Sequence, residues 1–500
     1  MGAEIKKKKQ TMMCAEELKF NNVRNKKLNS QATRKTRGIT LIALVVTIVV
    51  LLILAGITIS LVFSENGIIA KAKEAAEKTN QAAINEQAQM NELAGYLDNM
   101  LNEIGENGEE PNPPEPTLPS DGSYSEEKGV NTPNLGEGMT AIKWDETKND
   151  WVETNGSDKD WYDYTSKKWA NAKTSDGSMW VWIPRYAYSI TSGYHQSGAQ
   201  INPTTPAEGA GNIEVEFMKG LTNETSTGRT SFQNSSGQGK WNIHPAFSYG
   251  QTVSGIWVAK FEASNSGGKI KVVPGVASWR SITVNDIYTN CLNYNKTLNS
   301  HMMKNDEWGA VAYLSKSKYG KQNEEVWINN SSSYITGSAG NSASAGTDVG
   351  TTNDYTSTQG VKASTTGTVH GVYDMSGGAW EYVAGYVNNG NGNLTSYGSS
   401  LVNGAAKTKN VYSKASTDNA TNNYNANSGK YGDAVYETST SGSGSTSWYG
   451  DYSNFPDTSN PFFVRGGGYN DGSGAGVFCF SYNNGSSHIG TLFRPVLVAL

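Results

Sequence analysis

HGVYDMSGGAWEYVAGY, residues 370–386, is the stretch of the sequence that says most about the fold. Four of its side chains are large: Tyr373, Met375, Trp380 and Tyr382. Small residues separate them, and the pair Gly377-Gly378 allows the backbone to turn tightly. Aromatic side chains each bury a large apolar area. We therefore expect this stretch to pack the core of a domain that is otherwise built largely from loops.

Regular elements are expected on the N-terminal side of this stretch and loops on both sides. MWVWIPRYAYSI (179–190) and SGIWVAKFEAS (254–264) alternate large and small residues, which favours strands. NDEWGAVAYL (305–314) opens with Asn and Asp before apolar residues at helical spacing, which favours a helix. Residues 329–360 and 388–450 are rich in Ser, Gly, Asn and Thr and are expected to be long surface loops.

Three motifs together resemble the formylglycine-generating enzyme and sulfatase-modifying-factor family. NDEWGAVAYL resembles the family's TEAEWEYAA helix, and HGVYDMSGGAWEYVAGY resembles its GLYDMSGNVWEW. RGGGY (465–469) and FRPV (493–496) resemble the two ends of its RGGS…GFR frame. The resemblance covers most of 179–500. It implies an α+β, C-type-lectin-like domain, spanning 124–500 here, with small twisted sheets, two helices and long loops.

The chemistry of that family depends on two cysteines that this chain lacks. In the enzymes resembled, both follow RGGS and bind copper, whereas the nearest positions here are Asn470 and Asp471. Cys479 stands alone in an apolar run, and the chain has only three cysteines in all, without zinc-type spacing or a disulfide framework. We therefore expect no enzyme activity, no catalytic residue, no metal and no cofactor.

The tail, residues 465–500, has a composition that suggests diversification. The same fold includes the variable proteins of diversity-generating retroelements, in which a reverse transcriptase miscopies adenines. An Asn codon altered at its first two bases cannot become Lys, Glu, Gln, Met or Trp, and the tail contains none of these five types. Residues 329–358 lack them too, so the added weight comes from the tail's position between the two frame motifs.

We expect the tail to present a ligand-binding surface made of two clusters. Its mixture of Tyr, Ser, Asn and Gly is also the composition of antibody paratopes. The alternative is a solvated loop that binds nothing. The residues predicted to bind ligand are Gly468, Tyr469, Asn470, Asp471 and Ser473 in the first cluster, and Cys479, Ser481, Tyr482, Asn483, Ser486, Ser487, His488, Ile489, Thr491 and Leu492 in the second.

The N-terminal quarter of the chain reads as a membrane segment and a stalk. Residues 1–38 carry eleven Lys and Arg against three Glu and form a basic leader. Residues 39–63 contain no charged residue and, as a helix, would rise roughly 37 Å, enough to cross a bilayer core of about 30 Å. A transmembrane and stalk helix is predicted over 39–104, followed by a Pro- and Glu-rich linker at 105–123.

The junction RG|ITLIALVV resembles the type IV prepilin class, whose peptidase cleaves after the glycine. The processing site would lie between Gly38 and Ile39. The family's Glu at the fifth mature position is Ala43 here, so the resemblance supports anchoring better than filament assembly. An uncleaved signal anchor is the alternative. Either way, the predicted localisation is the bacterial cell membrane, single-pass, with the C-terminal domain exported to the cell surface.

Together these features predict a membrane-anchored, pilin-like surface protein that displays a possibly diversified ligand-binding domain. Expected partners are the membrane, an unknown protein or glycan ligand, prepilin peptidase and other pilin-like subunits. The net charge of −5 does not suggest a nucleic-acid partner. One alternative is a minor pilin or cell-envelope component with a lectin-like head. Another is an enzyme, using Cys479 with His488 or the carboxylates of Glu307 and Glu381.

Overall fold

The fold is mainly β, and the predicted α+β, C-type-lectin-like class is therefore wrong. The computed structural model describes residues 122–198, 209–346 and 352–500, all within one compact unit, Glu115–Leu500. Of these residues 28% are in strands and 15% in helices. Many of the strands are only two to four residues long. Such strands are too short to show the two-residue periodicity by which strands are predicted from sequence.

The largest sheet has seven strands in the order β13-β19-β10-β6-β5-β3-β4, and every neighbouring pair is antiparallel. Its central strands are buried along their whole length, and Trp182 and Trp257 lie in register with ring centroids 5.2 Å apart. The strands predicted in 179–190 and 254–264 are thus confirmed. The bounds are β3 Met139–Asp145, β4 Asp150–Glu153, β5 Asn171–Thr174, β6 Met179–Pro184, β10 Gly255–Ala259, β13 His301–Met302 and β19 Pro495–Leu497.

The second sheet contains both the 370–386 motif and the tail frame. It has the order β15-β14-β16-β17, and β18 pairs in parallel with β14. The last residues of the 370–386 motif, from Trp380 on, belong to β14. Arg465 and Gly466 are the last two residues of β16. Phe493 is the last residue of β18, after which the chain continues into β19 of the first sheet. The bounds are β14 Trp380–Val387, β15 Asn410–Tyr412, β16 Phe462–Gly466, β17 Gly476–Asn483 and β18 Thr491–Phe493.

Three small sheets complete the strand content of the described residues. One has three strands in the order β8-β7-β9, and the other two are the pairs β1-β2 and β11-β12. The bounds are β1 Tyr124–Ser125, β2 Val130–Asn131, β7 Tyr186–Ser192, β8 Asn212–Phe217, β9 Asn242–Ile243, β11 Ser264–Ser266 and β12 Lys269–Lys271.

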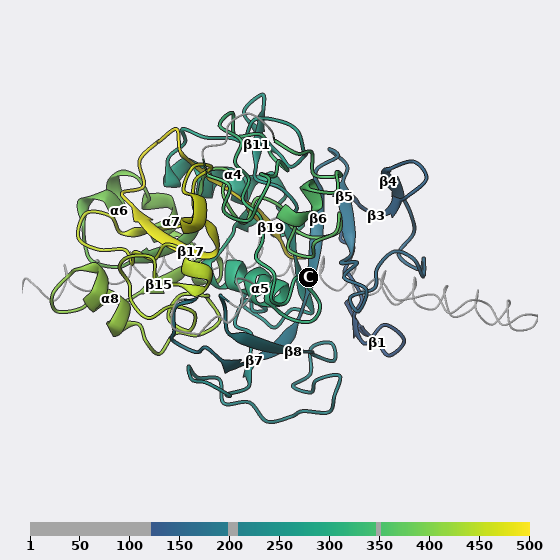
Figure 1. Cartoon of the computed structure of the whole chain (residues 1–500), viewed down its shortest axis with the longest axis horizontal. Helices are drawn as coiled ribbons and strands as arrows, with labels where there is room; N and C mark the ends of the chain where they lie inside the picture. The colour runs from purple at the N-terminus through teal and green to yellow at the C-terminus, as the bar shows by residue number, and fades with distance from the viewer. Residues whose placement is uncertain (1–121, 199–208, 347–351) are drawn as a thin grey trace, which may run out of the picture. The chain divides into compact units, whose positions relative to one another are not determined.

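The helices are short. They are α4 Val284–Tyr294, α5 Asn305–Lys316, α6 Gly392–Ser396, α7 Ser399–Asn403 and α8 Ala420–Ala426, with the 3-10 turns η3 Gly360–Ala363, η4 Ala406–Thr408, η5 Trp448–Gly450 and η6 Gly472–Gly474. Figure 1 shows α5 between β15 and β17 on one side and β6, β5 and β3 on the other.

Helix α5 is the predicted helix of the NDEWGAVAYL motif, and it is buried throughout. At its start, the Lys304 amide donates to Glu307 Oε2 at 2.8 Å. Trp308 Nε1 donates to the Val477 carbonyl of β17 at 2.8 Å. At Gly309 an added Cβ would lie 2.0 Å from the Gly432 carbonyl, so only glycine allows this approach. The motif therefore positions the second sheet.

Arg494 stands where the chain passes from the second sheet to the first. Its guanidinium is fully buried and donates to Glu381 Oε2 and Oε1 at 3.1 and 2.6 Å. It also donates to the carbonyls of Ala259 at 2.8 Å and Tyr373 at 2.9 Å. One side chain thus joins the end of β10, the 370–386 motif and β14. This explains why the tail closes on FRPV.

The prediction of a surface loop over 388–450 is wrong. The segment contains β15 and three helices, and its large side chains, such as Tyr424 and Trp448, are buried. Glu437 anchors it by accepting hydrogen bonds from the hydroxyls of Tyr188 and Tyr313 and from the Gly432 amide. The sequence misled because these apolar residues are spaced too widely to form a period.

The predicted localisation also needs correction. The residues on which it rests, 39–63 with the stalk up to 104, lie outside the described residues. Within 122–198, 209–346 and 352–500, no helix is long and apolar enough to cross a membrane. The longest helix there, α5, has 12 residues and rises about 18 Å, against a bilayer core of about 30 Å. The predicted single-pass membrane anchor thus finds no counterpart in the described chain.

Replacing Arg494 by Met should destabilise the domain by about 3–5 kcal/mol, because the buried Glu381 carboxylate would lose its partner. Urea unfolding of the full chain, followed by tryptophan fluorescence, measures the change. Lys173→Met is the matched control: it breaks an ion pair with Glu153 that is partly exposed, and should cost less than about 1 kcal/mol. Equal losses in the two variants would contradict the role assigned to Arg494.

Glu437 should make the domain less stable as the pH rises from about 5 to about 7. Burial raises the pKa of Glu437 from 4.5 to about 7, against the hydrogen bonds that it accepts. The folded state therefore holds a proton that the unfolded state releases, and this stabilisation disappears as pH rises through the folded pKa. Glu437→Gln should reduce the slope of unfolding free energy against pH by up to about 1.4 kcal/mol per unit. An unchanged slope would contradict the assignment.

Candidate ligand-binding face

Two glycines turn the chain out of the frame at the start of the tail. Gly466 and Gly467 have φ of 82° and 81°, in the left-handed region that favours glycine. An added Cβ on Gly467 would lie 2.7 Å from Ala475. The RGG motif is thus required by backbone geometry. Arg465 beside it is fully buried and donates to Asn305 Oδ1 at 3.3 Å and the Ala434 carbonyl at 3.2 Å.

The predicted ligand-binding residues fall into three groups by exposure. Six are exposed: Asn470, Asp471, Ser473, Ser487, His488 and Ile489. Four are half-buried: Tyr469, Tyr482, Asn483 and Ser486. Five are buried: Gly468, Cys479, Ser481, Thr491 and Leu492. The last group supports the surface from beneath and is not available for direct contact with a ligand.

Trp380 brings the two predicted clusters together. It is the first residue of β14 and is half-buried. Its amide donates to the Gly490 carbonyl at 3.0 Å, beside the second cluster. Its indole nitrogen would lie 3.5 Å from a Cβ on Gly468, at the start of the first cluster. The Tyr469 amide donates to the Gly378 carbonyl at 2.8 Å, which fixes the first cluster next to β14.

A second connection runs through residues outside the tail. The rings of Tyr469 and Tyr334 meet edge to face, with centroids 5.1 Å apart. The Arg280 guanidinium stacks on Tyr334 at 3.9 Å from the ring centroid. Arg280 also donates to the Ile489 carbonyl at 3.1 Å. We call the surface formed by residues 469–473, 487–489, Arg280, Tyr334 and Trp380 the tail face.

Sequence reasoning missed the members of the tail face that lie outside the tail. Trp380 was assigned to the core, although its motif did mark it as important. Tyr334 is the one aromatic residue in the Ser-rich run 329–334, a weak signal in hindsight. Nothing in the sequence around Arg280 pointed to this surface.

Both loops of the tail face are held by their own hydrogen bonds. Asp471 Oδ2 accepts from the Gly468 amide at 2.7 Å. His488 Nδ1 accepts from the Gly490 amide at 3.0 Å, and the His488 carbonyl accepts from Ser281 and Thr491 amides at 3.0 and 3.2 Å. These contacts order the loops before any ligand arrives, so little conformational entropy remains to be lost on binding.

Two of the predicted residues face the scaffold. Asn483 Oδ1 accepts from the Tyr382 hydroxyl at 2.6 Å, and the Ser486 carbonyl accepts from the same hydroxyl at 3.1 Å.

Burial raises the pKa of the Cys479 thiol well above its ordinary value, and the neighbouring Asp451 adds to this. Cys479 is therefore a packed thiol at neutral pH, because the reactive form is the thiolate.

The carboxylates considered as a catalytic pair belong to two separate buried networks. Glu307 accepts from the Lys304 amide and lies 2.9 Å from His301 Nε2. Both carboxylate oxygens of Glu381 accept hydrogen bonds from the Arg494 guanidinium. Among the residues that the structure describes, no group of three or more His, Cys, Asp or Glu is placed to hold a metal ion.

Comparison with protein-family models and with curated proteins finds no match for this chain. The features of the tail face therefore have to be interpreted from the chain's own geometry.

Exposed and buried residues of the tail should differ sharply in their tolerance of substitution. Ile489, with 61% of its surface exposed, should accept Ala with a change within about 0.5 kcal/mol. Leu492, two strand positions from Arg494 and fully buried, should lose about 2–5 kcal/mol as Ala. Urea unfolding of the two variants measures this, and similar losses would contradict the division of the tail into frame and face.

Proposed function

We propose that residues 122–500 form a ligand-binding domain and that the tail face is its binding surface. The observation that carries the proposal is that the two tail loops, which flank the buried strand β17, lie side by side. Both loops contact Trp380, and the stacked pair of Tyr334 and Arg280 also connects them.

The chemistry of the tail face suits recognition of a macromolecule. Tyr, Trp and Arg are the residues that dominate binding energy at protein interfaces. Here Tyr469, Trp380 and Arg280 are half-buried, which leaves part of each side chain free for contact. Exposed Asn, Ser and His side chains around them supply adaptable hydrogen bonds. A protein or a glycan is the ligand class that this combination favours.

Diversification of the tail is part of the proposal. Its exposed positions lie in loops that β16, β17 and β18 hold in place, so side chains such as Asn470, Ser487 and Ile489 can change at little cost in stability. Asp471 and His488 also cap their loops and are expected to change less freely. The absence of the formylglycine-generating-enzyme family's cysteines after RGG, where Asn470 and Asp471 stand, supports a binding function in place of its oxidation chemistry.

The competing prediction, a minor pilin or cell-envelope component, rests on residues 39–104. Those residues lie outside the described part of the chain, and no contact in the described part favours this reading over ligand binding. It remains a prediction from sequence.

DNA sequencing around the 3′ end of the gene tests diversification directly. We expect a near-copy of the last hundred or so nucleotides that differs mainly at adenines, with a reverse transcriptase gene nearby. The differing codons should encode exposed residues such as Asn470, Ser487 and Ile489 and should spare the buried Leu492. A near-copy whose differences fall equally on buried codons, or no near-copy at all, would contradict the proposed diversification.

Binding by the tail face is tested on the full chain, immobilised and probed with a glycan array and with a panel of bacterial and phage surface proteins. Any ligand bound by the wild type should be lost, by about tenfold or more, in Tyr469→Ala. Val411→Ala is the control, because Val411 is 39% exposed on β15 and outside the tail face. Equal binding by both variants would overturn the assignment of the surface.

A further inference from the structure

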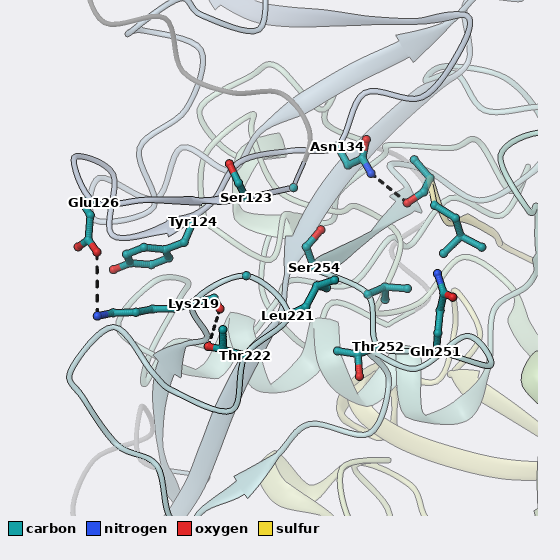
Figure 2. A pocket seen from close by; sticks show the side chains of 15 residues that line it. Ser123, Tyr124, Glu126, Asn134, Lys219, Leu221, Thr222, Gln251, Thr252 and Ser254 are labelled. Atoms are coloured by element: carbon teal, nitrogen blue, oxygen red, sulfur yellow. Dashed lines mark hydrogen bonds and ion pairs between the residues drawn. The ribbon is translucent and has the colours of Figure 1, made fainter. Parts of the chain in front are cut away.

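A separate groove lies at the other end of strands β10 and β19 from the tail face. Leu497 of β19 pairs with Trp257 of β10, and the chain segments beyond this pair, 251–254 and 499–500, form part of the groove wall. The remaining walls are the start of the domain, Gly122–Glu126, and the turn 219–222. These segments surround an open space of about 610 Å³. Figure 2 shows Tyr124, Lys219, Leu221 and Ser254 around it.

Two large aliphatic side chains are exposed to solvent in this groove, whose lining is otherwise mixed. Leu221 and Leu500 each have 60% of their surface exposed, and they are two of only five large hydrophobic residues exposed in the described ranges. Val253 and Tyr124 line the same space. Exposed apolar side chains that gather in one concave place mark a binding surface, because water contact there is unfavourable.

A buried hydroxyl is also directed into the groove. Ser254 is 9% exposed and lines the groove, and its side chain lies among the labelled residues in Figure 2. None of the hydrogen bonds described for residues 122–500 uses its Oγ atom. An unused hydroxyl at the edge of an apolar floor is suited to a ligand with apolar side chains and a polar backbone.

The chain itself supplies such a ligand next to the groove. Gly122 is part of the groove wall, and the residues before it read PNPPEPTLPSD, 111–121. This segment has five prolines and one large aliphatic residue, Leu118. Three residues lie between Leu118 and Gly122, and the four steps from one Cα atom to the next span at most about 14 Å when extended. Because Gly122 itself lines the groove, Leu118 lies within this reach of the groove wall.

Physical considerations favour binding of this segment in cis. Proline-rich segments keep an extended conformation and dock in apolar grooves at a low entropic cost. A ligand tethered by a few residues has an effective concentration in the millimolar range, so that even a weak contact is occupied. Lys219, at the Tyr124 end of the groove, is already paired with Glu224 at 3.0 Å and with Glu126 at 4.0 Å, so the contact depends on apolar packing.

We propose that residues 115–121 bind in this groove of the same chain, with Leu118 packed against Leu221 and Leu500. The contact would fix the direction in which the preceding chain leaves the domain. It does not depend on the function proposed for the tail face.

Crosslinking of paired cysteines tests the proposal on the full chain. Thr117→Cys with Thr222→Cys, which keeps Leu118 and Leu221, is treated with a short bismaleimide in a background with Cys14→Ser; Cys291 and Cys479 are buried and do not compete. We expect an intramolecular crosslink at several-fold higher yield than in the control pair Thr117→Cys with Val411→Cys. Equal yields would overturn the proposal. A crosslink formed between two singly substituted chains would assign the groove to a second copy and would also overturn it.

Hydrogen exchange of the groove backbone gives a second readout that needs no cysteine. Leu118→Asp should increase exchange in residues 219–222 and 251–254 by about tenfold, because one buried leucine is lost from the contact. Thr117→Asp adds the same charge one residue earlier and should leave exchange unchanged. Unchanged exchange in Leu118→Asp, or an equal increase in both variants, would contradict docking of Leu118.

Discussion

The buried contact between Arg494 and Glu381 is the constraint on which the rest of the domain depends. A guanidinium without solvent needs acceptors in a fixed plane, and here they come from β14, β10 and the 370–386 motif. Burial, together with the carboxyls of Asp374 and Glu381, raises the pKa of nearby Glu262 well above its ordinary value. This shift favours the neutral form of Glu262, so that the charge of Arg494 is balanced mainly by Glu381.

This constraint separates the parts of the tail that are fixed from those that can vary. Arg465 and Arg494 are buried near its two ends, and Gly466 and Gly467 must adopt left-handed backbone angles. Between these points, β17 is buried over most of its length, so exposed side chains remain only in the two loops that flank it. The loops keep their shape through backbone contacts to β14 and through caps supplied by the side chains of Asp471 and His488, so these two exposed residues are less free to change than Asn470.

Local sequence signals predicted the parts of the fold whose information is local. Helix α5 and strands β6 and β10 were found because each carries its pattern in a continuous run. The balance of strand and helix was not predicted, because two- and three-residue strands are defined by pairing and not by periodicity. The tail loops were found from composition and motif position. Arg280 could not be found in this way, because the residue that it contacts, Ile489, lies 209 positions further along the chain. Contacts between distant residues leave no mark on a single sequence.

The tail face and the apolar groove occupy opposite ends of the β10–β19 pair, with one continuous hydrophobic core between them. Close-packed cores resist deformation, so a change of side chain on the tail face does not need to move the residues near Gly122. A domain built in this way can change exposed side chains of the tail face without displacing the residues that line the groove. The position of the Arg494 contact, between these two ends, makes that separation possible because it fixes both sheets to one another.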